Sequence, residues 1–360
     1  MNDLLRLVQK TADRLADRHV GAVVAGLAGG EVEIRGAGRT GPDGAAPGPD
    51  TLFEIGSVTK VFTSLVLARL ALDGTVGLDD PLAEVLAGAL ADVPAGSGRG
   101  ATPVPTRNGR PVTLRQLATH TSGLPRLPRG LAAGALIGPN RPDPYARCTT
   151  EYVLAGLART RLRAKPGHAF RYSNLGAGLL GLALAHRAGT GYGDLVAREV
   201  CAPLGLADTC VRENEEQAGR LARGHTPGGR PVPYWDLAAL PGMGGLRSTA
   251  ADLVVLLRAQ LAAGHAPDGP LAAAVALTRE TRHRVNPFAW AHLGWLGHRL
   301  HSQQGGHLQI WHNGGTGGFA SFVAFDPDKQ VGVVVLANTR RPVDAAGTTL
   351  LRRLQNGPGA

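Results

Sequence analysis

Cysteine is scarce in this 360-residue chain: Cys148, Cys201 and Cys210 are its only three, and they form no C-x-x-C pair. An odd number of scattered cysteines predicts neither a disulfide framework nor a zinc site, so we expect buried free thiols. His292, His298 and His301 lie close together, but no cysteine or carboxylate stands at a matching spacing. Ordinary loop and surface histidines therefore account for them, and we expect no bound metal.

Long apolar runs are also missing. Residues 175–188 come nearest, but glycines interrupt them and they end at His186 and Arg187, short of the roughly 18 residues that cross a bilayer. The first ten residues interleave charges with leucines at three- and four-residue spacing and lack the basic-then-apolar order of a signal peptide. This pattern predicts an amphipathic helix and a cytoplasmic protein without a membrane partner.

Aromatic residues make up only 4% of the chain, and 28 acidic residues face 38 Lys and Arg, for a net charge of +10. Such a charge suggests nucleic-acid binding, which needs clustered bases and stacking aromatics. The basic residues are nearly all arginine, are spread along the chain, and lack interleaved aromatics where they cluster. We therefore expect no nucleic-acid partner. A solvated arginine-rich surface, or attraction of an anionic or carrier-borne substrate, explains the charge.

Hydrophobic residues, at 43%, are numerous enough for a large core. Near the N-terminus, residues 20–28 and 31–35 have the composition of strands and are separated by Gly29-Gly30, which predicts a β-hairpin. Further strand-like runs lie near the C-terminus and precede a closing helix at 343–354. These runs are 309–312, 320–325 and 331–337.

The middle of the chain has a different pattern, with short helices joined by Pro- and Gly-rich loops and little strand signal. Because strand signals occur at both ends of the chain, we predict an α+β fold in which residues 1–77 and 245–360 form one sheet flanked by helices. Residues 78–244 are predicted to form a mainly helical second lobe. We expect the active site between the two lobes.

Ser57-Val-Thr-Lys60, at the start of the apolar helix predicted for residues 61–72, is the first candidate for chemistry. A serine hydroxyl is a poor nucleophile unless a base removes its proton, and a lysine three residues later on a helix places its amine beside that hydroxyl. The helix start also brings free N–H groups and the helix dipole close to the reacting oxygen. The alternative is a plain helix N-terminus with an exposed lysine.

Two later segments can complete such a site with a second proton carrier and an oxyanion hole. Tyr172, within Tyr172-Ser-Asn174, is expected to have a lowered pKa beside a lysine ammonium and to exchange protons with the serine and the leaving group. The glycine-rich residues 311–319 end a predicted strand and allow a substrate close to a backbone N–H. Taken alone, these are also compatible with a buried aromatic and an ordinary hairpin turn.

Together, Ser57-Val-Thr-Lys60, Tyr172-Ser-Asn174 and His312-Asn-Gly314 resemble the three motifs of the serine β-lactamase and penicillin-binding-protein-like superfamily, in its class C β-lactamase and esterase branch. Their order and approximate spacing match, and the resemblance spans nearly the whole chain. It implies the β-lactamase/transpeptidase-like fold. Other stretches with a familial look are residues 72–81, 113–125, 244–252 and 318–322.

The resemblance also implies catalytic roles. Ser57 would be the acyl-accepting nucleophile, Lys60 its neighbouring base and Tyr172 the proton shuttle to the leaving group. Whether Lys60 or Tyr172 is the general base stays open. His120 would be a structural loop residue.

For substrate binding, the resemblance implies that Asn174 bonds the substrate and Lys60, and that His312 and Gly314 line the pocket. The backbone N–H groups of Ser57 and Gly315 would form the oxyanion hole. Loops at 124–144 and 289–304, expected to be irregular, would decide which acceptor enters.

One departure from the family bears on the substrate. β-Lactamases of this branch usually have lysine where His312 stands, and histidine there is seen more in esterases, D-peptide hydrolases and acyltransferases. We therefore expect an enzyme that forms acyl-Ser57 from a small ester or amide and passes the acyl group to water or to an amine or alcohol acceptor, as an esterase or a biosynthetic transacylase. The alternatives are a D-amino-acid peptidase or β-lactamase-type amide hydrolase, and a penicillin-binding sensor without turnover. This chemistry needs neither metal nor cofactor, and the sequence leaves the oligomeric state open.

Overall fold

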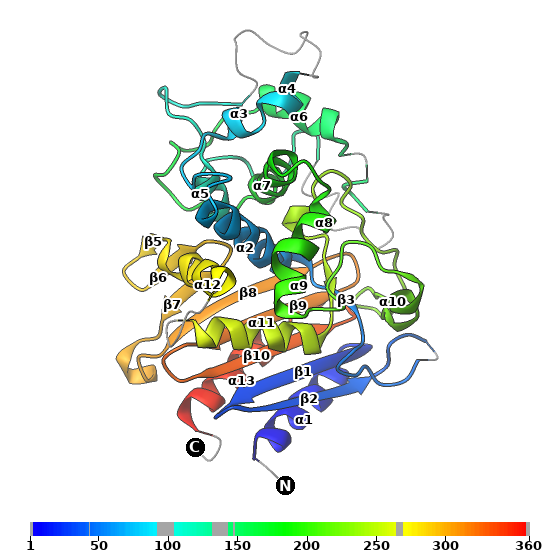
Figure 1. The fold of residues 1–360 in the computed structure, drawn as a ribbon. Coiled ribbons are helices and arrows are strands. Elements are labelled where there is room, and N and C mark those ends of the chain that lie inside the picture. Colours follow the sequence, from blue (N-terminus) through cyan, green and yellow to red (C-terminus); the bar gives the residue numbers. More distant parts are fainter. Residues whose placement is uncertain are drawn as a thin grey trace.

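An eight-stranded antiparallel sheet forms the centre of the molecule (Figure 1). The computed structural model describes residues 3–42, 44–91, 104–131, 143–146, 148–263 and 269–357. The strands of the sheet are β1 (Gly21–Ala28), β2 (Glu31–Gly38), β5 (Arg282–Asn286), β6 (Ala289–His292), β7 (Leu296–Arg299), β8 (Leu308–Gly315), β9 (Ala320–Asp326) and β10 (Val331–Ala337). Their spatial order is β2-β1-β10-β9-β8-β7-β6-β5, so the N-terminal hairpin lies against the last strand of the chain. The predicted sheet built from both termini is confirmed.

The hairpin β1-β2 follows from its sequence. Gly29 and Gly30 both adopt positive φ, +59° and +84°, which a two-residue turn with the twist of the flanking strands requires. In β1, side chains alternate between the two faces of the sheet, with Val23 in one apolar core and Val24 in the other. The strand is therefore buried on both faces.

Helices cover each face of this sheet (Figure 1). On one face, α1 (Asp3–Ala16) and α13 (Asp344–Asn356) enclose a core against β1, β9 and β10. On the other face, α11 (Ala250–Ala262) packs on β10, and α12 (Pro270–Glu280) lies against α2 (Thr59–Leu72). The core on this second face continues into the helical part of the molecule, so α2 stands at the centre of one large apolar cluster.

Further helices, most of them short, gather beyond the α2 side of the sheet (Figure 1). They are α3 (Leu82–Val85), α4 (Ala87–Ala91), α5 (Leu114–Ala118), α6 (Thr150–Ala158), α7 (Asn174–Arg187), α8 (Tyr192–Val196), α9 (Ala202–Leu204) and α10 (Glu215–Arg220). A separate pair of short strands, β3 (Phe53–Glu54) and β4 (Arg247–Ser248), precedes α2 and α11. The backbone N–H of His225 bonds to Gly318 at the end of the sheet, so part of the segment 78–244 also contacts the sheet. The division into two lobes at these residues stays a prediction.

Three strands of the eight-stranded sheet were missed by the sequence patterns. Residues 289–304 were expected to be a loop, but β6 and β7 lie there and extend the sheet, with β5 at its edge. The edge strand β5 is mostly exposed and carries Arg282, His283 and Arg284, so it shows no apolar alternation. The other expected loop, 124–144, is described only at 124–131 and 143–144, and both stretches are irregular.

The cysteines and histidines noted in the sequence have separate places. All three cysteines are free; Cys148 and Cys201 are buried as expected, whereas Cys210 is partly exposed. His292 bonds through Nδ1 to the Arg279 carbonyl, and His298 accepts from the indole of Trp311. Within the described ranges, no helix combines the length and the apolar character needed to cross a membrane.

Candidate active site

Ser57 lies in a single 3-10 turn, Gly56–Val58, between β3 and α2. The backbone N–H of Ile55 bonds to the Leu246 carbonyl at 3.0 Å, which fixes the entry to this turn. Gly56 has a φ of +50°, and a Cβ there would lie 2.6 Å from the backbone nitrogen of Gly315. Only glycine fits at this position, so the Ser57 turn packs directly against the end of β8.

Lys60 occupies the first turn of α2 and reaches back to the serine. Its Nζ donates to Ser57 Oγ at 2.8 Å and to the Met243 carbonyl at 2.5 Å, and the residue is only 2% exposed. Burial holds the pKa of the Lys60 amine well below its ordinary value, and the Arg126 guanidinium lowers it further. The alternative of an exposed lysine is therefore wrong. An uncharged amine in this place can take a proton from Ser57.

Tyr172 faces the same two groups. Its ring centroid lies 5.1 Å from Lys60 Nζ, and Tyr172 and Ser57 line the same cavity. Burial raises the pKa of Tyr172 to about 12, against the lowered pKa that the sequence predicted. That prediction assumed a charged ammonium, but the Lys60 amine is itself buried and favours its neutral form. Tyr172 thus stays a phenol at neutral pH and can donate a proton.

His120 holds the segment around Tyr172 in place. Its carbonyl accepts from the backbone N–H of Arg171 at 2.7 Å, and its Nδ1 accepts from the N–H of Ser173 at 3.3 Å. The two bonds bracket Tyr172, whose ring lies 4.4 Å from the imidazole, centroid to centroid. Burial lowers the pKa of His120 well below its ordinary value, so the ring is neutral. We predicted a structural role for His120, but its contact with Tyr172 was not visible in the sequence.

Asn174 is the first residue of α7. Ser173 caps this helix, accepting from the Gly176 N–H at 2.9 Å. The Asn174 Oδ1 is buried and has no hydrogen-bond partner among the described residues. The expected bond between Asn174 and Lys60 is not formed in this structure. The carboxamide oxygen thus lacks an internal partner at a residue that lines the cavity with Ser57.

His312 lies on β8 behind Tyr172, and its ring centroid is 6.3 Å from that of the tyrosine. Its Nδ1 contacts the carbonyl of Asn313 at 2.7 Å, and the residue is 1% exposed. Burial lowers the pKa of His312 to about 3. The imidazole is thus neutral and cannot supply the positive charge that a lysine would supply at this position.

The glycines that follow His312 bring the strand against the nucleophile. A Cβ on Gly314 would lie 2.1 Å from the Ile55 carbonyl and 2.9 Å from the backbone nitrogen of Ser57. The backbone nitrogens of Ser57 and Gly315 therefore stand together where the Ser57 turn meets β8. Two N–H groups in such an arrangement can stabilise the oxyanion of an attacked carbonyl.

These groups open into a cavity of about 540 Å³. Of the predicted site residues, Ser57, Tyr172, Asn174, Gly314 and Gly315 line it, whereas Lys60 and His312 lie behind its wall. Several lining residues were not predicted, because they lie outside the three short motifs. They include Arg126, Tyr145, Phe170, Trp235, Arg340 and Arg341. Only the scarcity of tyrosine and tryptophan in the chain could have drawn attention to Tyr145 and Trp235.

Comparisons with known proteins agree with this geometry. The profile of the family described as Beta-lactamase matches residues 7–356. The chain is 32% identical over 351 residues to the D-alanyl-D-alanine-carboxypeptidase/endopeptidase AmpH of Escherichia coli K12, covering 92% of this chain and 84% of that protein. It is 28% identical over 315 residues to penicillin-binding protein 4 of Amycolatopsis lactamdurans, covering 82% and 74%.

The fold has close counterparts among solved structures. A beta-lactamase/D-alanine carboxypeptidase from Yersinia pestis superposes with a TM-score of 0.77 at 27% identity, covering 99% of both chains. The expected β-lactamase/transpeptidase-like fold is thereby confirmed. With the family profile spanning nearly the whole chain and relatives named as hydrolases, the protein is a serine hydrolase that belongs to the Beta-lactamase family.

Proposed function

We propose that the protein forms a covalent acyl-Ser57 intermediate from a small ester or amide and passes the acyl group to water or to an amine or alcohol acceptor. The observation that carries this proposal is the 2.8 Å contact between Lys60 Nζ and Ser57 Oγ, made by an amine that is buried and favours its neutral form. A neutral amine beside a serine hydroxyl is an activated nucleophile pair. Lys60 is therefore the general base of the first step in this proposal.

The first half-reaction uses three of the groups described above. Ser57 Oγ forms a bond to the substrate carbonyl carbon as its proton passes to Lys60, and the carbonyl oxygen takes up negative charge between the N–H groups of Ser57 and Gly315. When the bond to the leaving group breaks, the Tyr172 phenol donates a proton to it and regains one from the Lys60 ammonium. In the second half-reaction, water or the acceptor forms a bond to the acyl carbon and gives up its proton to the same pair. The bond from the acyl carbon to Ser57 Oγ then breaks, and the pair returns a proton to Ser57 Oγ.

The character of the cavity guides the choice of substrates. Because His312 is neutral, β8 itself offers no cation for a substrate carboxylate, so any such group would have to meet the arginines that line the cavity, Arg126, Arg340 and Arg341. The unpartnered Oδ1 of Asn174 is suited to the N–H of an acylamino group. Similarity to proteins named as a D-alanyl-D-alanine carboxypeptidase and as a penicillin-binding protein supports including D-alanyl peptides and a penicillin among the compounds tested.

The test is the intact-protein mass after brief reaction with an activated short-chain ester, a D-alanyl-D-alanine peptide or a penicillin, with and without an added amine. We expect one acyl group on the wild type and none on Ser57→Ala. Ser302→Ala, which removes an exposed hydroxyl far along the chain, is the matched control and should acylate like the wild type. An equal adduct on Ser57→Ala would disprove the proposal.

The fate of the adduct separates hydrolysis from transfer. Loss at a rate independent of amine indicates hydrolysis by water, while faster loss with amide formation indicates a transacylase. A penicillin adduct that persists while the ester is never turned over would instead indicate a sensor. Turnover of the D-alanyl peptide in preference to the ester would assign a peptidase.

A further inference from the structure

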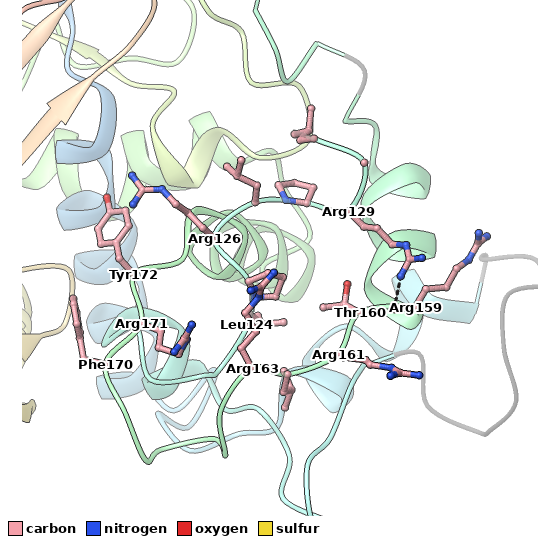
Figure 2. A pocket seen from close by; sticks show the side chains of 16 residues that line it. Leu124, Arg126, Arg129, Arg159, Thr160, Arg161, Arg163, Phe170, Arg171 and Tyr172 are labelled. Atoms are coloured by element: carbon pink, nitrogen blue, oxygen red, sulfur yellow. Dashed lines mark hydrogen bonds between the residues drawn. The ribbon is translucent and has the colours of Figure 1, made fainter. Parts of the chain in front are cut away.

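A second and larger pocket lies beside the catalytic cavity. It has a volume of about 950 Å³ and is formed by residues 124–131, 159–163 and 170–172; we call it the arginine pocket (Figure 2). Arg126, Phe170 and Tyr172 line both the arginine pocket and the cavity that contains Ser57. The two spaces therefore adjoin at Tyr172, and a molecule in one can extend into the other.

Among the residues that the structure describes, the arginine pocket is lined by six arginines and by no acidic residue. All six are exposed, and none forms an ion pair with a carboxylate in the part of the chain that the structure describes. They are Arg126, Arg129, Arg159, Arg161, Arg163 and Arg171. Guanidinium groups keep their charge at all physiological pH values, so this concave surface holds a concentrated positive field without internal compensation.

The charge of the whole chain originates in the same region. Residues 99–171 contain 13 Lys and Arg but only 2 Asp and Glu, whereas the other 287 residues contain 25 and 26. The net charge of +10 is thus concentrated in one segment, and the even spread assumed in the sequence analysis was wrong. Of the two acids, Asp143 accepts from the backbone N–H groups of Tyr145, Asp236 and Leu237, and does not neutralise the pocket.

The arginines are arranged along the pocket rather than gathered at a single point. Figure 2 shows Arg126 beside Tyr172 at one end and Arg129 with Arg159 at the other. The Arg126 guanidinium lies 5.3 Å from the Tyr172 ring centroid, at the boundary with the catalytic cavity. Arg161 and Arg163 flank the buried Leu162, which anchors this wall in the core.

We propose that the arginine pocket binds a multiply charged oxyanion group, such as a diphosphate or a tricarboxylate, carried by the substrate whose acyl bond reaches Ser57. Arginine binds phosphate and carboxylate oxygens through paired N–H groups, and several arginines along one wall suit more than one anionic centre. The volume is in the range of sites that hold small organic ligands. The link to the acyl bond rests on the proposed function, whereas anion binding by the pocket does not.

Binding is measured by titration calorimetry on the full chain carrying Ser57→Ala, so that no turnover interferes. The probes are inorganic pyrophosphate, citrate and, as a singly charged control, acetate. We expect pyrophosphate or citrate to bind and acetate not to bind. Whichever of the two binds more tightly identifies phosphate or carboxylate as the source of the charge. Absence of binding by both at a low salt concentration of about 50 mM would overturn the proposal.

Matched variants locate the binding. Arg163→Gln/Arg171→Gln removes two side chains that make no hydrogen bond with other described residues, and we expect at least about a tenfold weaker affinity. Arg187→Gln/Arg258→Gln makes the same change in net charge at exposed positions outside the pocket and should bind like the parent. Equal weakening in both double variants would show a general charge effect and refute the site.

The link to catalysis needs a pair of esters that share an acyl group and differ by a phosphate on the alcohol. We expect the phosphorylated ester to have the higher kcat/KM in the wild type, and this preference to fall at least about tenfold in Arg163→Gln/Arg171→Gln. Equal kcat/KM values for the two esters would overturn the substrate assignment. If neither ester acylates Ser57, the proposed function fails instead, and the calorimetry still decides whether the pocket binds anions.

Discussion

The catalytic centre and the arginine pocket meet at Tyr172, but they differ in how far their basic side chains are buried. In the centre, burial favours the neutral forms of Lys60, His120 and His312 by lowering the pKa of each. In the pocket, by contrast, the six arginines are all exposed to solvent. The difference shows that burial decides which basic residues can take up a proton and which can only attract an anion.

Arg126 stands at the boundary between these two environments. Its guanidinium lies against the Tyr172 ring and contributes to the lowered pKa of Lys60. The charge of the pocket therefore acts on the catalytic centre as well, by opposing protonation of the lysine. An anion bound beside Arg126 would weaken this effect, so the two regions are coupled electrostatically.

The largest effect is expected from a permanent positive charge in the catalytic centre, because it would remove the difference in ionisation between the two regions. Lys60→Arg keeps a long basic side chain but cannot lose its proton, so we expect the rate of Ser57 acylation to fall by about a thousandfold or more, close to the loss in Lys60→Ala. The measurement is burst-phase acylation by the activated ester. The wild-type rate should also fall as pH falls through the lowered pKa of Lys60, because the amine must be unprotonated to accept the serine proton.

Arg258→Lys, an exchange in the opposite direction at an exposed position, is the control for general effects of altering a basic residue. It should leave acylation unchanged. Rapid acylation of Lys60→Arg with a native circular dichroism spectrum would show that Lys60 is not the base.

The effect of burial can also be tested on an acid, Glu54, which precedes Ser57 by three residues. Glu54 in β3 is 4% exposed; its Oε1 accepts from the Trp235 N–H at 2.6 Å, while Oε2 has no partner within the described residues. Burial raises the pKa of Glu54 from 4.5 to about 7, with the Trp235 N–H acting in the opposite direction. Between pH 4.5 and about 7, the Glu54 carboxyl is ionised in the unfolded chain but still protonated in the folded protein. The free energy of unfolding therefore falls as pH rises from 4.5 to about 7, by up to about 3 kcal/mol from this group.

Glu54→Gln removes this titration, so its free energy of unfolding should exceed that of the wild type at about pH 8 and lose the advantage at about pH 4.5. Urea denaturation at both pH values measures the difference. Glu215→Gln changes an exposed carboxyl at the start of α10 and should retain the wild-type pH dependence. The same pH dependence in Glu54→Gln and the wild type would mean that Glu54 does not carry a raised pKa.

The sequence predicted those parts of the site that lie within short motifs. Ser57 and Lys60 are brought together by one helical turn, and the end of β8 follows its glycines, so spacing and backbone preference were sufficient. The terminal strands β1, β9 and β10 were found because they are buried on both faces and rich in apolar residues. Local pattern and apolar content carried these predictions.

What was missed depends on contacts between distant segments. The exposed edge strand β5 lacks an apolar pattern, and Tyr145 and Trp235 reach the cavity from irregular loops. The pKa of Tyr172 was predicted in the wrong direction because burial of both Tyr172 and Lys60 is a property of the folded protein. The concentration of arginine was present in the sequence, but only the pocket shows which of them share a surface.

The smallest expected effect concerns His120, whose backbone and ring hold Tyr172 between the two hydrogen bonds to Arg171 and Ser173. His120 has a φ of +56°, which asparagine tolerates, and the asparagine oxygen can accept from the Ser173 N–H in place of Nδ1. We expect His120→Ala to lower kcat about tenfold with little change in KM, and His120→Asn to recover much of the loss. A role that acts only through Tyr172 predicts that His120→Ala costs nothing further in a Tyr172→Phe background, because the displaced phenol is already absent. An additional tenfold loss in that double variant would show that His120 acts on the reaction by another route.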